Sequence, residues 1–85
     1  MVSPLQVSAD LWATSLLPEG ILEGWLRPDG SLVEAGDPVA IVRIEDALHE
    51  LVAPAKGQLS ISVKVHAVIE PGTILGNIVR NLRSG

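Results

Sequence analysis

Apolar residues in this chain gather in short stretches that glycines and prolines separate every few residues. In residues 59–65 an aliphatic side chain occupies every second position, which predicts a strand with one buried face. Residues 39–44 are almost continuously apolar, as in a strand that is covered on both faces. Further runs of strand length lie at residues 5–9, 21–26, 48–53 and 75–79. The pattern therefore predicts an all-β protein.

The segments between these runs carry turn signals. Asp29 and Gly30 predict a hairpin turn, because a type I′ turn needs residues that accept positive φ. Residues 45–51 have side chains that favour a helix, but they are too few for a stable one. No segment has both the length and the 3.6-residue period that predict a helix.

The two halves of the chain repeat one order of features: a glycine, an apolar run, a Glu-x-Gly turn and a second apolar run. Gly20 corresponds to Gly57 at a separation of 37 positions, and Gly36 corresponds to Gly72 at 36. Two copies are too few for a solenoid, which needs about three stacked units. They fit a closed pair of sheets related by a pseudo-two-fold axis. Chance similarity between short strands is the alternative.

The composition suits one small domain, which we place at residues 1–85 with a core at about 5–80. Hydrophobic residues make up 47% of the chain, as in a globular protein. Phe and Tyr are absent, so the core must consist of Val, Ile, Leu and Ala. Trp12 and Trp25 either fill this core or form a stacking platform for bases or sugars. The lack of other aromatic residues favours the first role.

Charge and cysteine content exclude several classes of function. The formal net charge is −4 and the basic residues are scattered, whereas binding to phosphate groups needs clustered Lys and Arg. We therefore expect no nucleic acid and no membrane as partner, and a basic protein surface is the better match. Without cysteine there are no disulfides or thiol nucleophiles. Because a signal peptide and a membrane-spanning stretch are not evident, we expect a soluble, cytoplasmic protein.

Several motifs together resemble the lipoyl/biotinyl attachment domain family. They are Gly20-Ile-Leu-Glu-Gly-Trp-Leu26, Pro28-Asp-Gly30, Val33-Glu-Ala-Gly-Asp-Pro-Val-Ala40, Ala53-Pro-Ala-Lys-Gly57 and Glu70-Pro-Gly72. The family includes the lipoyl domains of dihydrolipoyl acyltransferases in 2-oxoacid dehydrogenase complexes, the glycine-cleavage carrier protein and the biotin carboxyl carriers. The resemblance covers residues 7–79. It implies a flattened β-sandwich (a barrel-sandwich hybrid) of two antiparallel sheets with pseudo-two-fold symmetry, and a carrier lysine on an exposed turn.

The resemblance also locates that turn. In the family the modified lysine lies eleven residues before the glycine that corresponds to Gly57, usually within Asp-Lys-Ala. The triplet here is Glu45-Asp46-Ala47. An amide-linked lipoyl or biotinyl arm needs an amine, which the carboxyl group of Asp46 cannot supply, so we expect no cofactor. A second departure is that residues 64–67 lack the glycine of the family's second-half turn, which indicates a remodelled loop.

The acidic tip at Glu45, Asp46 and Ala47 is a candidate docking surface for a basic partner, together with His49 and Glu50 nearby. A solvated turn is the alternative, because Asp is common in turns, where its side chain caps backbone amides.

Lys56 is the alternative attachment point, because it is the lysine nearest the predicted hairpin. It falls in the loop 54–57, where an enzyme that recognises a hairpin turn would meet it poorly, so an ordinary exposed lysine is the simpler interpretation. Lys64 lies on the polar face of the predicted strand 59–65 and is a weaker candidate. Lipoate or biotin is expected only under this alternative.

Metal binding and catalysis have little support in the sequence. His49 and His66 lack the spacing of metal ligands, and His49 falls where the family usually has an apolar residue, so we expect a partly buried core histidine and no metal site. Ser60 and Ser62 alternate along a predicted strand without a nucleophile-elbow motif. We therefore expect no catalytic residues and no enzyme activity.

The resemblance and the missing amine lead to one functional hypothesis and two alternatives. The hypothesis is a lipoyl-like domain without an attachment lysine that acts as a non-catalytic interaction or structural module related to acyltransferase components. It would be monomeric in isolation and would contact protein components of a carrier-dependent complex through the hairpin and the loop before Pro18. The alternatives are a genuine carrier modified at Lys56, and a binder of small molecules or metals near His49.

Overall fold

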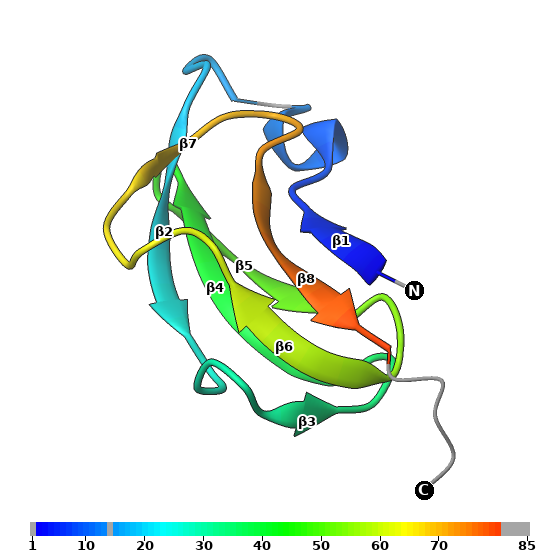
Figure 1. Cartoon of the computed structure of the whole chain (residues 1–85). Helices are drawn as coiled ribbons and strands as arrows, with labels where there is room; N and C mark the ends of the chain where they lie inside the picture. The colour runs from blue at the N-terminus through cyan, green and yellow to red at the C-terminus, as the bar shows by residue number, and fades with distance from the viewer. Residues whose placement is uncertain (1, 14, 81–85) are drawn as a thin grey trace, which may run out of the picture.

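The computed structural model describes residues 2–13 and 15–80. These residues form two four-stranded antiparallel sheets and one 3₁₀ turn, η1 (Ala9–Trp12) (Figure 1). One sheet has the strand order β1-β8-β6-β3 and the other β5-β4-β2-β7. The strands are β1 Val2–Gln6, β2 Gly20–Trp25, β3 Leu32–Val33, β4 Pro38–Ile44, β5 Ala47–Val52, β6 Gly57–Ile61, β7 Val68–Ile69 and β8 Ile74–Val79.

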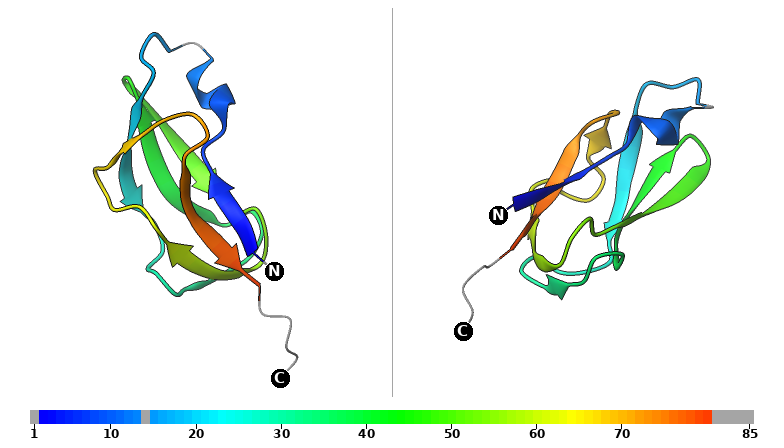
Figure 2. Two further views of the ribbon diagram at one scale, coloured as in Figure 1. Left: turned by 45° about the horizontal axis from the view of Figure 1, so that its top comes forward. Right: turned by 90° about the vertical axis from the view of Figure 1, so that its right-hand side faces the viewer.

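The two sheets pack face to face as a flattened β-sandwich, which confirms the predicted fold class (Figure 2). They remain two open sheets, because β1, β3, β5 and β7 each pair on one side only among the described residues. The expectation of a closed pair is wrong in this respect. The ends of β1 and β8 lie side by side at one end of the molecule, since Val2 pairs with Val79. The β4–β5 hairpin and η1 lie at the other end (Figure 1).

The pseudo-two-fold symmetry extends to individual hydrogen bonds. In the turn before β4, the amide of Glu34 donates to the Asp37 carboxylate at 2.9 Å. In the turn before β8, the amide of Glu70 donates to the Thr73 hydroxyl, also at 2.9 Å. The third residue of each turn is a glycine, with φ of 91° in the first turn and 89° in the second. Because this left-handed region favours glycine, both turns depend on it.

Glycines at the start of β2 and β6 make the same close contact in the two halves. A Cβ on Gly20 would lie 2.8 Å from the backbone oxygen of Arg43 in β4. A Cβ on Gly57 would lie 2.6 Å from the backbone oxygen of Val79 in β8. Arg43 and Val79 are themselves 36 positions apart, the separation of the repeat. The repeat in the sequence therefore reflects structural symmetry and not chance.

The turn at Asp29 and Gly30 is not a hairpin, contrary to the sequence prediction. The flanking strands do not pair with each other, because β2 pairs with β4 and β7 whereas β3 pairs with β6. The Asp29 carboxylate accepts a hydrogen bond from the Ile61 amide at 2.8 Å, and the Gly30 amide donates to the Leu59 carbonyl at 2.7 Å. The positive φ of Gly30 thus carries the chain from one sheet to the other.

Strand β6 ends four positions before the end of the predicted strand 59–65. The amides of Ser62 and Val63 both donate to the carbonyl of Leu75, at 2.9 and 3.1 Å. Two consecutive donors on one acceptor interrupt the alternation of the ladder, as in a β-bulge. In the turn that follows, His66 has a φ of 75° where the first half of the chain has Gly30. The remodelled loop therefore keeps a backbone shape that favours glycine.

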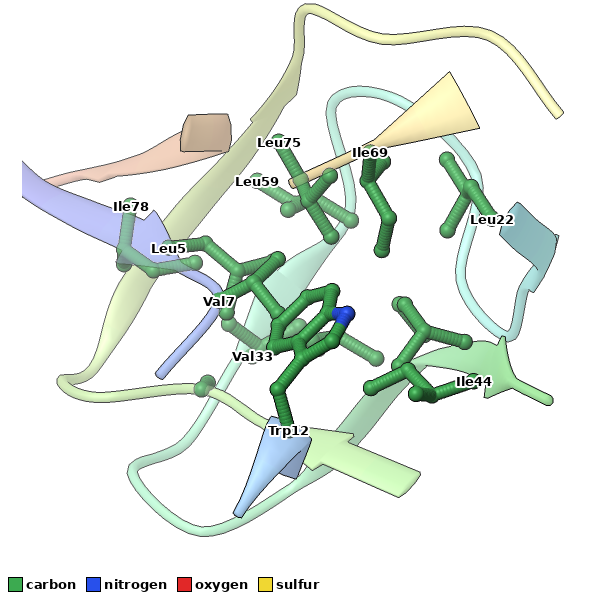
Figure 3. Close-up of a cluster of buried hydrophobic side chains, with 14 residues drawn as sticks. Leu5, Val7, Trp12, Leu22, Val33, Ile44, Leu59, Ile69, Leu75 and Ile78 are labelled. Atoms are coloured by element: carbon green, nitrogen blue, oxygen red, sulfur yellow. The ribbon is translucent and has the colours of Figure 1, made fainter. Parts of the chain in front are cut away.

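The core consists of aliphatic side chains from both sheets and one tryptophan (Figure 3). Trp12 is 8% exposed and packs in this core from η1, while Trp25 is partly buried against it. Both therefore act as core residues, as expected. The Trp25 indole N–H donates to the Val63 carbonyl at 2.9 Å. The Trp12 N–H has no partner among the described residues, which costs about 1–3 kcal/mol and is offset by the burial of the large ring.

Substitution of Gly76 in β8 tests the packing of the central strands. A Cβ at this position would overlap the backbone oxygen of Ser60 in β6 and lie 3.3 Å from the Cα of Ile61. We expect Gly76→Ala to lower the free energy of unfolding by about 1–3 kcal/mol, measured by urea denaturation. Gly24→Ala is the matched control, because nothing lies within 4 Å of its Cβ position, and it should change stability by less than about 0.5 kcal/mol. Equal losses in the two variants would contradict this packing.

Candidate functional site

A two-residue reversal joins β4 to β5 and presents two carboxylates to solvent. Ile44 pairs with Ala47 across the turn, so Glu45 and Asp46 are its central residues. Ile44 is buried in the core and anchors the end of β4, whereas the next three side chains are exposed. The structure therefore places the predicted tip residues together at a chain reversal. The helical alternative for residues 45–51 is excluded, because they form this turn and most of β5.

Glu45 holds the tip and a neighbouring loop together. Its φ is 54°, in the left-handed region that favours glycine, whereas Asp46 has no positive φ. The Glu45 carboxylate accepts a hydrogen bond from the amide of Leu16 at 2.8 Å. In the described part of the chain, Asp46 makes no such contact. The residue with the strained backbone is therefore also the one whose side chain holds the connection between β1 and β2 against the hairpin.

Two open grooves flank Glu45. The larger has a volume of about 340 Å³ and lies between the β1–β2 connection and the hairpin, with Leu11, Ser15, Asp46 and His49 in its wall. The smaller has a volume of about 190 Å³, and its wall includes Leu17, Glu19, Arg43 and Val68. Each groove combines aliphatic side chains with carboxylates. This arrangement suits the binding of a side chain that has both an apolar and a basic part.

His49 and Glu50 lie on opposite faces of β5. His49 pairs with Val42, which pairs with Leu22, and both of these are fully buried, so His49 lies at the edge of the inner face and is partly buried. Glu50 pairs with Ile41 and is exposed on the outer face. The two residues proposed to dock a partner with the tip therefore point in different directions. Of these two residues, Glu50 is the one on the outer surface of the sheet.

The two lysines lie away from the hairpin tip. Lys56 is in the connection between β5 and β6, and β5 separates it from the tip by six residues, or about 20 Å of strand. Its side chain is 72% exposed and lies 3.9 Å from the Glu34 carboxylate. Lys64 is in the connection between β6 and β7, and not on a strand as predicted. Neither lysine occupies a two-residue reversal of the kind that presents Asp46.

The described residues offer no group of three or more His, Asp and Glu side chains that could hold a metal ion. In residues 2–13 and 15–80 there is also no helix with the length and apolar character needed to span a membrane.

Comparison with protein families decides the identity of this fold. A family model described as biotin-requiring enzyme matches residues 13–78, which are 66 of the 85 positions. The chain belongs to the biotinyl/lipoyl attachment domain family. The matched segment of this biotinyl/lipoyl domain includes the hairpin and both copies of the Glu-x-Gly turn. Domains of this family are carrier modules rather than catalysts. No curated protein matches the chain.

Sequence reasoning named the loop before Pro18 as a contact surface beside the hairpin, but it did not single out the residues of this loop in the biotinyl/lipoyl domain. Leu16 is 94% exposed, and Leu17 is 52% exposed on the rim of the smaller groove. The available signal was the pair of consecutive leucines before Pro18, because contiguous exposed apolar side chains mark interaction surfaces, whereas single ones do not. The contact between Glu45 and the Leu16 amide had no signal in the sequence, since it joins residues 29 positions apart.

Two substitutions of Glu45 separate its backbone strain from its side-chain contact. Glu45→Ala removes the acceptor for the Leu16 amide, so hydrogen exchange at Leu16 should become faster. Glu45→Gly removes the same acceptor but fits the positive φ, so it should be more stable than Glu45→Ala by about 1 kcal/mol in thermal or urea unfolding. Asp46→Ala is the control and should leave exchange at Leu16 unchanged. Equal stability of the Ala and Gly variants would argue against a strained tip.

Proposed function

We propose that this biotinyl/lipoyl domain carries no lipoyl or biotinyl group and acts as a non-catalytic protein-interaction or structural module. By resemblance, its relatives are the lipoyl domains of acyltransferase components in 2-oxoacid dehydrogenase complexes. The observation that carries the proposal is the pair of carboxylates, Glu45 and Asp46, in the exposed two-residue turn between β4 and β5. In the family, the corresponding turn presents the carrier lysine.

The chemistry of attachment supports this proposal. Lipoate and biotin are linked to carrier domains through an amide bond, which requires a nucleophilic amine on the domain. The carboxyl groups of Glu45 and Asp46 cannot form that bond, so the residues at the tip do not fit the group that the family carries. The alternative is attachment at Lys56. Its distance from the tip and its place in an ordinary connection argue against that alternative, although its exposure would permit modification.

The surroundings of the tip support binding to a protein. The turn carries two negative charges, and the smaller groove beside it adds Leu17 and Glu19 together with one basic residue, Arg43. Leu16, whose amide binds Glu45, is exposed in the adjoining loop. A partner with a basic and aliphatic surface would complement this region, because opposite charges steer association while apolar contacts supply affinity. We infer that the partner is a protein component of a carrier-dependent complex, and that this domain contacts it without transferring a group.

Introducing an amine at the tip tests whether this turn is the carrier position. We expect Asp46→Lys, in a Lys56→Arg background, to accept lipoate or biotin from the respective ligase, with the added mass measured on the intact protein. The unaltered protein from its own host should show no added mass. A lipoyl or biotinyl mass that disappears in Lys56→Arg would instead establish the alternative.

Charge reversal at the tip tests the docking surface. The immobilised domain should recover dehydrogenase, acyltransferase or carboxylase components from an extract of its host, identified by mass spectrometry. Asp46→Arg should reduce this recovery at least about tenfold, as expected for the loss of roughly 1.4 kcal/mol of binding. Glu34→Lys, an equal change of charge beyond the other end of β4, should retain it. The proposal is wrong if these components are absent or if both variants behave alike.

A further inference from the structure

The four edge strands of the sandwich differ in how well they are protected against pairing with another chain. Strands β3 and β7 have two residues each, too short to template a partner strand. Strand β1 contains Pro4, which cannot donate a backbone hydrogen bond. Strand β5 has six residues without proline, glycine, lysine or arginine. Among the described strands, β5 is therefore the edge that lacks these protections.

The free edge of β5 has a defined set of outward-facing groups. Because Ile44 and Ala47 form the hydrogen-bonded pair of a two-residue hairpin, alternate residues of β5 direct their backbone groups toward β4, and Leu48 and Glu50 direct theirs away from it. No backbone hydrogen bond outside the sheets involves Leu48 or Glu50 in the described structure. Both residues therefore offer an unused amide and an unused carbonyl to an added strand.

The side chains of these residues lie on the outer face of the sheet. Leu48 is 64% exposed, Glu50 is exposed and Val52 is 48% exposed, so aliphatic and acidic positions alternate along the edge. Leu48 also ends a row of paired residues that crosses all four strands, through Arg43 and Ile21 to Val68. A fifth strand beside β5 would extend this row and cover Leu48.

We propose that the β5 edge binds an extended segment of a partner protein by strand addition. The segment has an aliphatic, a basic and an aliphatic residue at alternate positions, opposite Leu48, Glu50 and Val52. Directly opposed side chains in antiparallel strands interact, and opposite charges or aliphatic pairs stabilise the pairing. This site is separate from the hairpin tip and does not depend on whether the domain carries a cofactor.

Charge favours such a partner over a second copy of this chain. In the symmetric register that brings Leu48 opposite Val52 of the second copy, Glu50 would face Glu50, and like charges directly opposite each other destabilise the pairing. The net charge of −4 adds long-range repulsion between copies and attracts a basic segment. A basic residue opposite Glu50 removes the unfavourable contact and keeps the two aliphatic ones.

A designed peptide tests the proposal on the full chain. The probe is the capped peptide Thr-Val-Thr-Lys-Thr-Val-Thr, and the matched control has Glu in place of Lys. With the Lys peptide at about ten times its fitted Kd, amide hydrogen exchange at Leu48 and Glu50 should slow about tenfold, measured by NMR. The Glu peptide should bind at least about fivefold more weakly. No slowing at Leu48 and Glu50, at any peptide concentration up to saturation of solubility, overturns the proposal.

Two variants check the charge and the backbone contributions. Glu50→Lys should reverse the preference, so that the Glu peptide binds more tightly. Glu70→Lys makes the same charge change directly after β7, the opposite edge strand of the sheet, and should not reverse it. Leu48→Pro removes an outward-facing donor that the sheet itself does not use, so the domain should fold and bind the Lys peptide at least about fivefold more weakly. An unchanged preference in Glu50→Lys contradicts the register. If, in the absence of peptide, hydrogen exchange at Leu48 and Glu50 slows as the protein concentration rises, a second copy of the chain occupies the edge. The proposed partner is then wrong.

Discussion

The arrangement of this sandwich depends on one turn that occurs twice. In each copy a glycine with positive φ sends the chain into a central strand, and its amide binds the end of an edge strand. The Gly36 amide donates to the carbonyl of Ala53 beyond β5, and the Gly72 amide donates to the carbonyl of Val7 beyond β1, both at 2.9 Å. The turn therefore sets the direction of β4 and β8 and also holds the neighbouring edge strand in register. The place of the β4–β5 hairpin follows from this, because it lies one strand length beyond the first copy of the turn.

The sequence was most informative where one residue type satisfies a backbone requirement. The repeat of Gly36 and Gly72 predicted the symmetry, and the apolar runs predicted the positions of the central strands. The expectation that residues 39–44 are covered on both faces is wrong, because Arg43 is exposed on the outer face of β4 whereas Val42 and Ile44 are buried on the inner face. The sequence was misleading at Asp29 and Gly30, because the same local turn can either close a hairpin or lead the chain from one sheet to the other. Hydrogen bonds to distant residues of β6 decide between these two outcomes. The early end of β6 was hidden for a similar reason, because apolar and polar residues continue to alternate in the sequence up to residue 65 although the bulge against Leu75 ends the ladder.

The position of the turn at residues 45 and 46 was predictable from the sequence, whereas the construction of the turn was not. Counting from Gly57 placed Asp46 at the reversal, because the family motif fixes the length of β5. The positive φ of Glu45 and its bond to the Leu16 amide had no signal in the local sequence. The opposite orientations of His49 and Glu50 follow from the period of two in a strand, once the register with β4 is known. Proximity in sequence was therefore a poor guide to a shared surface.

The shape of the tip is produced by backbone and core contacts that do not involve the residue at position 46. Ile44 is buried, Ala47 pairs with it, and Glu45 connects the turn to the loop. A change of the tip residue from an amine to a carboxylate would leave these contacts in place, so attachment chemistry can be lost without loss of the fold. The same hairpin then presents a charge of the opposite sign at its tip and an unprotected strand edge along its side. A basic partner would complement both, because Asp46 in the turn and Glu50 in β5 belong to the same hairpin, and this shared negative charge is the electrostatic basis of the proposed protein recognition.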